Sequence, residues 1–199
     1  MSAPDPYLIP GTSVLLNLAK INSAEELALA EADLANARIV QLMDSGSSAL
    51  PDSRDFQEIS AIHFHLFQDI YGWAGKLRTI DMNRAGGHFF APCGYLRINL
   101  DHLTVELKEK NFLRLDDRNE FIQELAYFYD LLNWIHPFRE GNRRTQRLFW
   151  SRVSADAGWI LDWRPIQRGL NEASQRARED EDFEMLHVLL EKAVSQRRN

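Results

Sequence analysis

Apolar side chains along this chain recur mostly at three- and four-residue steps, the spacing that places them on one face of a helix. The clearest stripe runs from Arg118 to Ile135 and consists of Phe121, Leu125, Phe128, Leu132 and Ile135. Such a stripe marks a central helix with a buried face. Further helices are predicted over Ser23 to Met43, Asp55 to Trp73, Tyr95 to Asn111, Asn142 to about Gly158, Pro165 to Arg178 and Asp182 to Gln196.

The stretch from about Leu77 to Ala91 departs from this helical pattern and predicts a β-hairpin. Two short runs of β-compatible residues, 77–82 and 88–91, flank a turn that contains Asn83, Arg84 and the pair Gly86 and Gly87. Glycine-rich turns between such runs are typical of hairpins. The expected fold class is therefore mainly α with one small hairpin.

The composition is that of one compact soluble domain over residues 1–199. A chain of 199 residues with 45% hydrophobic residues can bury a core without a metal or a disulfide, and Cys93 is its single cysteine. The formal charge of −6 argues against a protein whose whole surface binds nucleic acid or anionic lipid. Arg139 to Arg147 nevertheless hold four arginines against one glutamate. Any phosphate chemistry is expected to be local to this stretch.

The sequence predicts neither a membrane span nor a secretory signal. The longest uncharged stretch, Pro6 to Ala19, is interrupted by proline, glycine and asparagine and is shorter than the ~18 apolar residues of a spanning helix. No apolar signal core follows the N-terminal methionine. A single cysteine is typical of a reducing compartment. We therefore expect a cytoplasmic protein.

The candidate chemistry lies in His136 to Arg147, between two predicted helices. Pro137 biases His136 away from helical geometry, so the first helix is expected to end there. Asn142 is a good N-cap, and the amides of the first turn after it would face the loop at the positive end of the helix dipole. Arg144 and Arg147 are three residues apart and share a helical face. This arrangement predicts a phosphate site.

Two further groups in this loop suit transfer of a phosphoryl or nucleotidyl group to a hydroxyl. His136 can take a proton near neutral pH, and Glu140 offers a hard oxygen ligand. Mg²⁺ is commonly held by one or two carboxylates together with substrate phosphates, so a single glutamate is sufficient. A surface turn followed by a basic helix is the plainer interpretation, and the ordered co-occurrence of these residue types in one short stretch argues against it.

The stretch His136 to Arg147 resembles the signature of the Fic family (filamentation induced by cAMP), His-x-Phe-x-Asp/Glu-Gly-Asn-Gly-Arg-x-x-Arg, at all positions but one. Tyr71 to Arg78 and Phe89 to Pro92 resemble the segments at the two ends of the family's flap hairpin. Tyr7 to Thr12 resembles the start of bacterial Fic toxins and of the Fic domains of secreted effectors. The resemblance implies a single Fic domain, a helical bundle around a central helix–loop–helix at 136–147 with a flap at about 77–91.

The resemblance implies a protein adenylyltransferase, which transfers AMP from ATP to a Ser, Thr or Tyr hydroxyl of a target protein. In that scheme His136 is the general base that takes the hydroxyl proton. Glu140 holds the Mg²⁺ that bridges the α- and β-phosphates. Asn142 and the backbone amides after Gly141 form the anion hole for the α-phosphate.

The resemblance also assigns the remaining arginines and the flap. Arg144 would contact the β-phosphate side, and Arg147 would bind the γ-phosphate. The flap would hold an extended target segment by strand addition. The flap residues expected at this target site are Met82, Asn83, Arg84, Gly86, Gly87, His88 and Phe89.

Arg143 is the position that departs from the family pattern, where most members have glycine. Glycine lets phosphate approach the backbone closely, and a side chain can obstruct that approach, although the backbone amide of Arg143 remains available to bind phosphate. In the Doc branch of the family a lysine at this position accompanies transfer of the γ-phosphate instead. The alternatives to an adenylyltransferase weakened by Arg143 are therefore a Doc-like phosphotransferase and an inactive domain that binds a nucleotide or a partner.

The regulation of many relatives rests on an inhibitory helix that reads Ser/Thr-x-x-x-Glu-Gly/Asn, whose glutamate pairs with the last arginine of the signature, here Arg147. Neither the run that starts at Ser23 nor the run that starts at Ser174 has glutamate at the required position. The resemblance therefore implies that a small antitoxin protein supplies this glutamate, as in bacterial toxin–antitoxin pairs. A fragment of a secreted effector is the other possible origin, and neither nucleic acid nor membrane is an expected partner.

Two groups of residues are expected to have structural roles. His63 and His65 lie two apart on a predicted helix, so they point to different faces and argue against a zinc site. The five tryptophans are scattered through predicted helices rather than gathered on one basic face, which indicates core packing and not a base-stacking surface.

Overall fold

The computed structural model describes residues 5–45, 50–83, 89–166 and 169–196, and it is mainly helical, as predicted. The α-helices are α1 (Ala24–Ser45), α2 (Phe56–Phe67), α3 (Leu96–Glu109), α4 (Arg118–Ile135), α5 (Asn142–Asp156), α6 (Leu170–Glu179) and α7 (Glu184–Ala193). The shorter elements are the 3-10 helices η2 (Cys93–Tyr95), η3 (Asn111–Leu113) and η4 (Arg164–Ile166) and the strands β1 (Trp159–Leu161) and β2 (Val194–Gln196). None of the helices in the described ranges combines the length and apolarity that crossing a bilayer requires.

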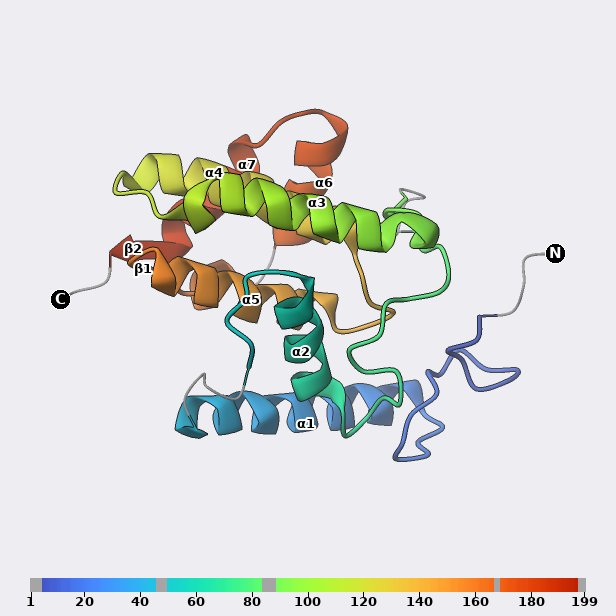
Figure 1. The fold of residues 1–199 in the computed structure, drawn as a ribbon. Coiled ribbons are helices and arrows are strands. Elements are labelled where there is room, and N and C mark those ends of the chain that lie inside the picture. The colour runs from blue at the N-terminus through green and yellow to red at the C-terminus, as the bar shows by residue number, and fades with distance from the viewer. Residues whose placement is uncertain (1–4, 46–49, 84–88, 167–168, 197–199) are drawn as a thin grey trace.

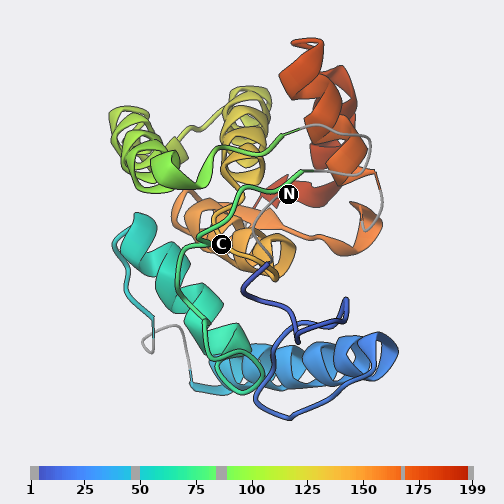
Figure 2. The same ribbon diagram turned by 90° about the vertical axis from the view of Figure 1, so that its right-hand side faces the viewer.

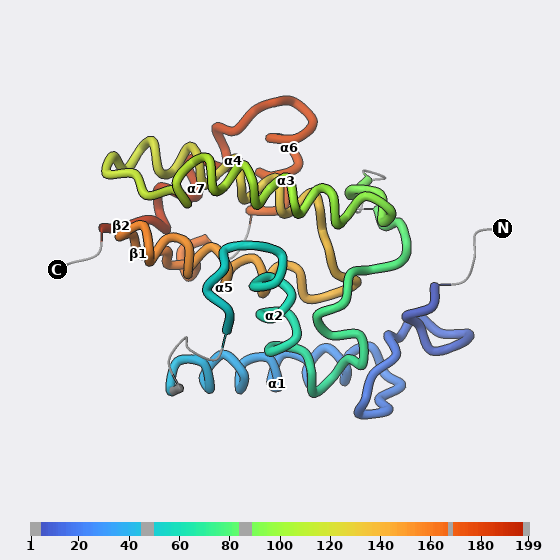
Figure 3. Tube along the Cα trace, viewed as in Figure 1, coloured from blue at the N-terminus to red at the C-terminus, as the bar shows by residue number. Residues whose placement is uncertain are grey.

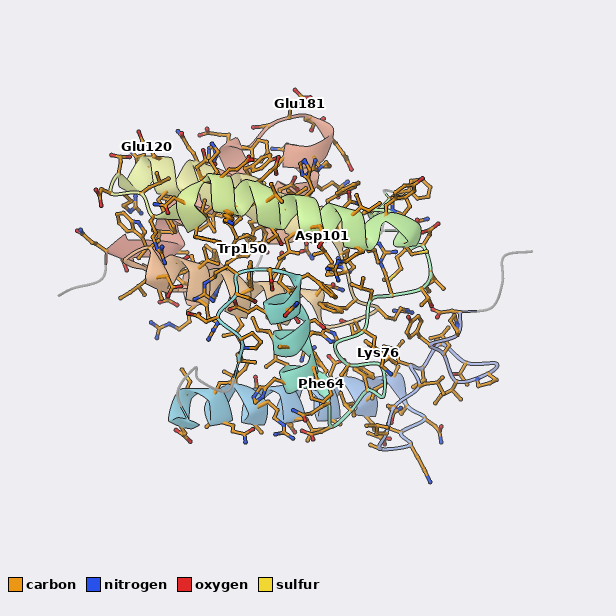
Figure 4. The ribbon with its side chains drawn as sticks, viewed as in Figure 1. Phe64, Lys76, Asp101, Glu120, Trp150 and Glu181 are labelled. Carbon is orange, nitrogen blue, oxygen red and sulfur yellow. The ribbon has the colours of Figure 1, made fainter. Side chains whose placement is uncertain are left out.

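Helix α5 lies in the middle of the molecule, between two groups of helices (Figures 1 and 2). Helices α1 and α2 lie on one side of it, and α3, α4, α6 and α7 lie on the other. Phe149, Trp150 and Val153 of α5 are fully buried. Figure 4 shows Trp150 between α5 and the α3–α4 side, whereas Glu120 and Glu181 lie at the outer edge. Because α5 contacts both α2 and α4, both groups of helices set the position of its N-terminus.

Four predicted helices are confirmed, with ends that agree to within two residues: those at 23–43, 95–111, 118–135 and the helix that starts at 142. The prediction of one helix from Pro165 to Arg178 is wrong. Pro165 lies in η4, and α6 begins only at Leu170. Gly169 has a φ of +86° directly before α6, a conformation that glycine adopts without steric cost and that separates the two elements.

Helix α2 ends at Phe67 and not at Trp73, as the sequence pattern predicted. The backbone N–H groups of Ile70 and Tyr71 both donate to the carbonyl of Phe67, at 3.1 and 2.9 Å, so the chain turns there. Gly75 then takes a φ of +76°. Ile70 and Tyr71 are nevertheless buried in the core. The apolar pattern therefore continued past the end of the helix and concealed it.

Residues 194–196 form a strand where the pattern predicted helix up to Gln196. Strand β2 pairs antiparallel with β1, with Trp159 opposite Gln196 and Leu161 opposite Val194. Trp159, Leu161 and Val194 are buried, so this small sheet closes one end of the core. A strand of this length is too short to show the alternation from which strands are predicted.

The chain between α2 and α3 crosses from one group of helices to the other along one end of the molecule (Figure 3). On this path the backbone N–H of Arg78 donates to the carbonyl of Pro137 at 2.9 Å, and that of Ala91 donates to the carbonyl of Trp134 at 3.0 Å. This segment is therefore bonded at one place to the connection between α4 and α5, which carries the candidate chemistry, and at another to the last turn of α4.

His63 of α2 is a buried histidine that joins α2 to two loops. Its Nδ1 accepts a hydrogen bond from the backbone N–H of Gly75 at 2.8 Å, so Nε2 carries the proton and donates to the carbonyl of Glu140 at 2.9 Å. The imidazole stacks on Phe138, with 3.8 Å between ring centroids. Burial lowers the pKa of His63 to about 4, although the hydrogen bond to Glu140 opposes this shift. The expectation of a structural histidine agrees with these contacts.

Acidification should destabilise the fold through His63. Its folded-state pKa of about 4 lies below the ordinary value of 6.5, so its contribution to stability is complete above pH 6.5 and is lost as the pH falls toward 4. A pKa shift of this size lowers the free energy of unfolding by on the order of 3 kcal/mol across this pH range. We expect His63→Gln to flatten the pH dependence across this window, measured by urea denaturation at a series of pH values.

The control is His102→Gln, which removes a histidine from the surface of α3 whose side chain is 67% exposed. This variant should keep the pH slope of the wild-type protein. The same slope in the wild-type protein and in His63→Gln would contradict the role given to the buried ring.

Candidate active site

The loop of residues 136–141 joins α4 to α5, and both of its ends have left-handed backbone geometry. His136 ends α4 with φ 48° and ψ 61° and donates its N–H to the carbonyl of Leu132 at 3.1 Å. Pro137 favours this break, because the residue before a proline avoids right-handed helical geometry. Gly141 precedes α5 with a φ of 80°. The predicted end of the helix at His136 is confirmed.

Gly141 occupies a position that excludes a side chain. A Cβ built there would lie 2.4 Å from Cε2 of Phe67, and a positive φ is unfavourable for other residues. The Gly141 carbonyl accepts hydrogen bonds from the backbone N–H of Thr145 at 3.1 Å and from its Oγ1 at 3.0 Å. The glycine thus allows the aromatic ring of α2 to pack directly against the start of α5.

Asn142 shapes the loop instead of capping α5, so the N-cap prediction is wrong. Gly141 is the N-cap, and Asn142 is the first helical residue. Its Oδ1 accepts from the backbone N–H of Phe138 at 2.9 Å, and its Nδ2 donates to the Phe138 carbonyl at 2.7 Å. This reciprocal pair satisfies both backbone groups of a buried residue. Asparagine is common at helix N-caps, and the loop geometry gives its amide a different use here.

The His136 imidazole borders a cavity of about 370 Å³. Its ring stacks on Phe90, with 3.7 Å between centroids and 15° between planes. The other residues that line this cavity are Asn83, Asn133, Asn171, Glu172 and Gln175. Most of them carry amides, which can both donate and accept hydrogen bonds. The cavity can therefore hold a planar polar group close to the imidazole.

A buried polar network orients Asn133 at this cavity. Asn133 donates to Oγ of Ser174 at 2.7 Å, and Ser174 donates to Oδ1 of Asp130 at 2.6 Å. Gln146 donates to Oδ1 of Asn133 at 3.4 Å, and Arg178 forms an ion pair with Asp130 at 2.6 Å. The network joins α4, α5 and α6, so three helices fix the cavity wall. Sequence analysis missed it because these residues are adjacent only in the folded chain.

Glu140 has an exposed side chain at the start of α5. Its Oε1 accepts from the backbone N–H of Gly141 at 2.9 Å, while His63 holds its backbone carbonyl. Within the residues that the structure describes, no group of three or more His, Cys, Asp or Glu side chains could hold a metal ion. A cation here would therefore take one carboxylate oxygen from the protein and the rest of its ligands from water or substrate, which fits the habits of Mg²⁺.

Arg144 has its charge balanced within the protein. It forms an ion pair with Glu31 of α1, and the same carboxylate accepts a hydrogen bond from the hydroxyl of Tyr71. The guanidinium lies over the ring of Phe67, 4.9 Å from the centroid. Glu31 is 7% exposed. Sequence reasoning missed Glu31 because nothing in the local pattern of α1 distinguishes it from the other acidic residues there.

Arg147 lies one turn further along α5, on the predicted shared face with Arg144. Its guanidinium lies 5.4 Å from the ring centroid of Trp163 and donates to the carbonyl of Ile166 at 3.4 Å. Burial lowers the pKa of Arg147, and the charge of Arg143 lowers it further. Arg144 and Arg147 both line a cavity of about 550 Å³, which confirms that they share a face. Arg143 is exposed in the first turn of the same helix.

The predicted flap is described only in part. Of its predicted target-site residues the structure describes Met82, Asn83 and Phe89, whereas Arg84, Gly86, Gly87 and His88 lie outside the described residues. A single antiparallel bridge joins Asn83 to Phe89, and the backbone N–H of Phe90 donates to the carbonyl of Met82 at 3.2 Å. Apart from these two contacts the predicted strands do not form over their described parts, where the backbone N–H groups of Arg78 and Ala91 bond to Pro137 and to Trp134 of α4.

Comparisons with known proteins point to one family. The model of the Fic/DOC family matches residues 54–153. The chain is 31% identical over 194 residues to the "Probable protein adenylyltransferase Fic" of Salmonella typhimurium, which covers 98% of this chain and 94% of that protein. It is 35% identical over 164 residues to "Protein adenylyltransferase VbhT" of Bartonella schoenbuchensis. This match covers 82% of this chain and 34% of VbhT.

The fold is also that of a solved structure. BepC of Bartonella tribocorum, described as a VirB-translocated effector protein with bound AMPPNP, matches with a TM-score of 0.85 at 25% identity, over 96% of this chain and 97% of that one. The signature loop, the helical architecture and the sequence relatives all point to the same family. The chain therefore belongs to the Fic/DOC family.

Proposed function

We propose that this chain is a protein adenylyltransferase that transfers AMP from ATP to a hydroxyl group of a target protein. The observation that carries the proposal is the position of His136, whose imidazole borders a polar cavity and which begins the loop that leads into α5. The N–H groups of a helix's first turn have no intrahelical partners and favour anions. BepC, which shares the fold, binds AMPPNP, and two relatives are named protein adenylyltransferases.

In the proposed reaction the target hydroxyl oxygen forms a bond to the α-phosphorus of ATP. The bond from the α-phosphorus to the oxygen that bridges to the β-phosphate breaks, and pyrophosphate leaves. His136 accepts the hydroxyl proton, and the backbone amides at the start of α5 stabilise the charge on the α-phosphate oxygens. Glu140 would hold Mg²⁺, which when bound neutralises part of the phosphate charge.

Arg144 and Arg147 are the proposed ligands of the β- and γ-phosphates. Arg144 donates to Glu31 through one terminal nitrogen, and a guanidinium has five N–H donors, so it can bind phosphate while Glu31 orients it. The contribution proposed for Asn142 is revised. Its side chain holds Phe138, so its share in the anion hole comes from its backbone N–H.

The cavity beside His136 is the proposed adenosine site. Asn133 and Gln175 offer amides that can pair with the edge of a purine, and Asn171 and Glu172 offer groups that can bond to ribose hydroxyls. The stacked ring of Phe90 closes the cavity beside the imidazole. This assignment places the α-phosphate between the cavity and the start of α5, within reach of His136.

The flap is the proposed docking site for the target protein. Phe89 is 72% exposed, and a single bridge at Asn83 organises the described ends of the flap. Main-chain pairing there would hold an extended target segment without reading much of its sequence. Met82, Asn83 and Phe89 support this from the structure, and the same role for Arg84, Gly86, Gly87 and His88 rests on the sequence resemblance.

ATP labelled at the α-phosphate should label protein when it is incubated with this chain, Mg²⁺ and cell lysate. His136→Ala should reduce the transfer about 100-fold or more, since a positioned general base commonly contributes a factor of that size. His102→Ala removes a surface histidine and should keep the activity.

The outcome of this experiment decides between the three functions that the family resemblance allows. Labelling by the α-phosphate supports adenylyl transfer. Labelling by the γ-phosphate alone replaces it with a Doc-like phosphotransferase. Binding of ATP without either label makes the chain an inactive nucleotide-binding domain.

Arg143 is proposed to weaken this activity. It is exposed in the first turn of α5, at the position where the family signature has glycine, and its side chain would compete for the space that phosphate takes near the backbone. Arg143→Gly should raise AMP transfer on the order of 10-fold, which corresponds to about 1.4 kcal/mol in the barrier.

Arg143→Ala serves as the comparison, because it removes the charge and keeps Cβ. An increase in both variants assigns the obstruction to the long side chain, and an increase in Arg143→Gly alone assigns it to Cβ. Equal AMP transfer by the wild-type protein and Arg143→Gly would contradict the proposal that Arg143 weakens the activity.

Inhibition is proposed to come from a helix of another chain, as in a toxin with a small antitoxin. The cavity beside Arg147 is lined by apolar side chains, among them Ile39 and Leu42 of α1 and Leu148 of α5. An apolar helix face with one glutamate fits both this lining and the cation. The glutamate would take the place of the γ-phosphate at Arg147. The same arrangement suits a bacterial cytoplasmic toxin and the Fic domain of a translocated effector.

A labelled helical peptide that carries Ser-x-x-x-Glu-Gly on an apolar face should bind this chain more tightly than its twin with glutamine in place of glutamate. The difference should vanish in Arg147→Met, because the methionine keeps the apolar stem and removes the charge. Fluorescence anisotropy measures both affinities. Equal binding of the two peptides to the wild-type protein would exclude a glutamate contact at this site.

A further inference from the structure

Arg78 is a buried arginine beneath the α4–α5 connection, and the proposed reaction gives it no role. It lies in the segment between α2 and α3 and is 2% exposed. Burying a guanidinium is unfavourable unless its donors are satisfied. The partners that satisfy it therefore indicate what this residue does.

The partners of Arg78 are backbone carbonyls on two separate segments. Its Nε donates to the carbonyl of His136 at 2.8 Å, and one terminal nitrogen donates to the carbonyl of Ile80 at 2.6 Å. The other terminal nitrogen donates to the carbonyls of Ala91 and, at 3.3 Å, of Ile135. One planar group thus joins the end of α4 to both ends of the flap.

These bonds hold His136 from two directions. The hydrogen bond from Arg78 to the His136 carbonyl fixes the left-handed backbone geometry at the end of α4. The bond to Ala91 fixes the residue that follows Phe90, whose ring stacks on the imidazole. The backbone N–H of Arg78 adds a third bond, to the carbonyl of Pro137 at 2.9 Å. Both the backbone and the ring of His136 therefore depend on one side chain.

We propose that Arg78 is a positioning residue for His136, which couples the flap to the orientation of the imidazole. The inference rests on the proposed function, because it assumes that His136 acts as the base. Arginine is required for this because a guanidinium presents donors in a rigid plane that reaches several carbonyls at once. A lysine ammonium is a single point charge on a flexible stem.

Arg54 provides a matched control, because it is a second buried arginine, 6% exposed, with a different kind of partner. It forms ion pairs with Glu58, at the start of α2, and with Asp156, at the C-terminal end of α5. The candidate site lies at the opposite end of α5. Arg54→Lys therefore reports the general cost of replacing a buried arginine without touching the α4–α5 connection.

The first measurement is the NMR resonance of the His136 Cε1–H, assigned by its disappearance in His136→Ala. In the wild-type protein the stacked ring of Phe90 should move the chemical shift of this proton away from the value of a solvent-exposed histidine. Arg78→Lys should move it toward the exposed position, whereas Arg54→Lys should leave it in place. This measurement does not require the protein to be active.

The second measurement is AMP transfer per folded molecule, in the more active of the wild-type and Arg143→Gly backgrounds. Arg78→Lys should lower kcat by about 10- to 100-fold, the size expected from a small misplacement of a catalytic group, with little change in the KM for ATP. Arg54→Lys should lower the melting temperature and keep kcat. If Arg78→Lys does not fold, Phe90→Leu tests the same contact, since it should also move the resonance and lower kcat.

A folded Arg78→Lys protein with the wild-type resonance and the wild-type kcat would overturn the inference. Absence of AMP transfer from every background would remove the proposed function, and the resonance of His136 would then decide by itself whether Arg78 positions the ring. The two failures are therefore distinguishable.

Discussion

The short loop between α4 and α5 is the constraint on which the rest of the site depends. Both of its ends are left-handed, at His136 and Gly141, and an interior loop in this geometry must find partners for its backbone groups elsewhere. Asn142 satisfies Phe138, and His63 and Arg78 bind the carbonyls of Glu140 and His136. The donors to Glu140 and His136 come from α2 and from the chain that leads to the flap. The fold outside the motif thus sets the geometry inside it.

The same arrangement separates the two cavities to which catalysis and inhibition are proposed. The polar cavity that His136 borders is walled by α4 and α6, and a buried network through Asn133 fixes it. The larger cavity at Arg144 and Arg147 is walled by α1 and is mostly apolar. The catalytic site proposed at one cavity and the inhibitory site proposed at the other are connected through the first turns of α5. An inhibitory partner could therefore act on the nucleotide without contacting the imidazole.

Electrostatics at this site differ from what the count of charges suggests. The four arginines from Arg139 to Arg147 give a strongly positive stretch in an acidic chain. In the folded protein Arg139 pairs with Asp5 and Arg144 pairs with Glu31, so neighbours from the N-terminal part of the chain offset two of these charges. Arg147 is half-buried beside Arg143, and the positive charge of Arg143 contributes to lowering the pKa of Arg147. An anion bound at Arg147 would offset this repulsion.

The sequence by itself determined the helical class, the stripe of α4 and the loop that carries His136, because apolar periodicity and the Pro137 signal are local properties of the chain. It could not determine the end of α2, since Ile70 and Tyr71 are buried whether or not they are helical. The capping role expected for Asn142 was lost to the left-handed turn at Gly141, which directs the amide to Phe138. The strands expected for the flap depended on partners distant in sequence, Pro137 and Trp134. Glu31 and Arg78 acquire their roles only where the folded chain brings them to Arg144 and His136, because a single buried side chain that bonds to distant backbone groups leaves no periodic trace.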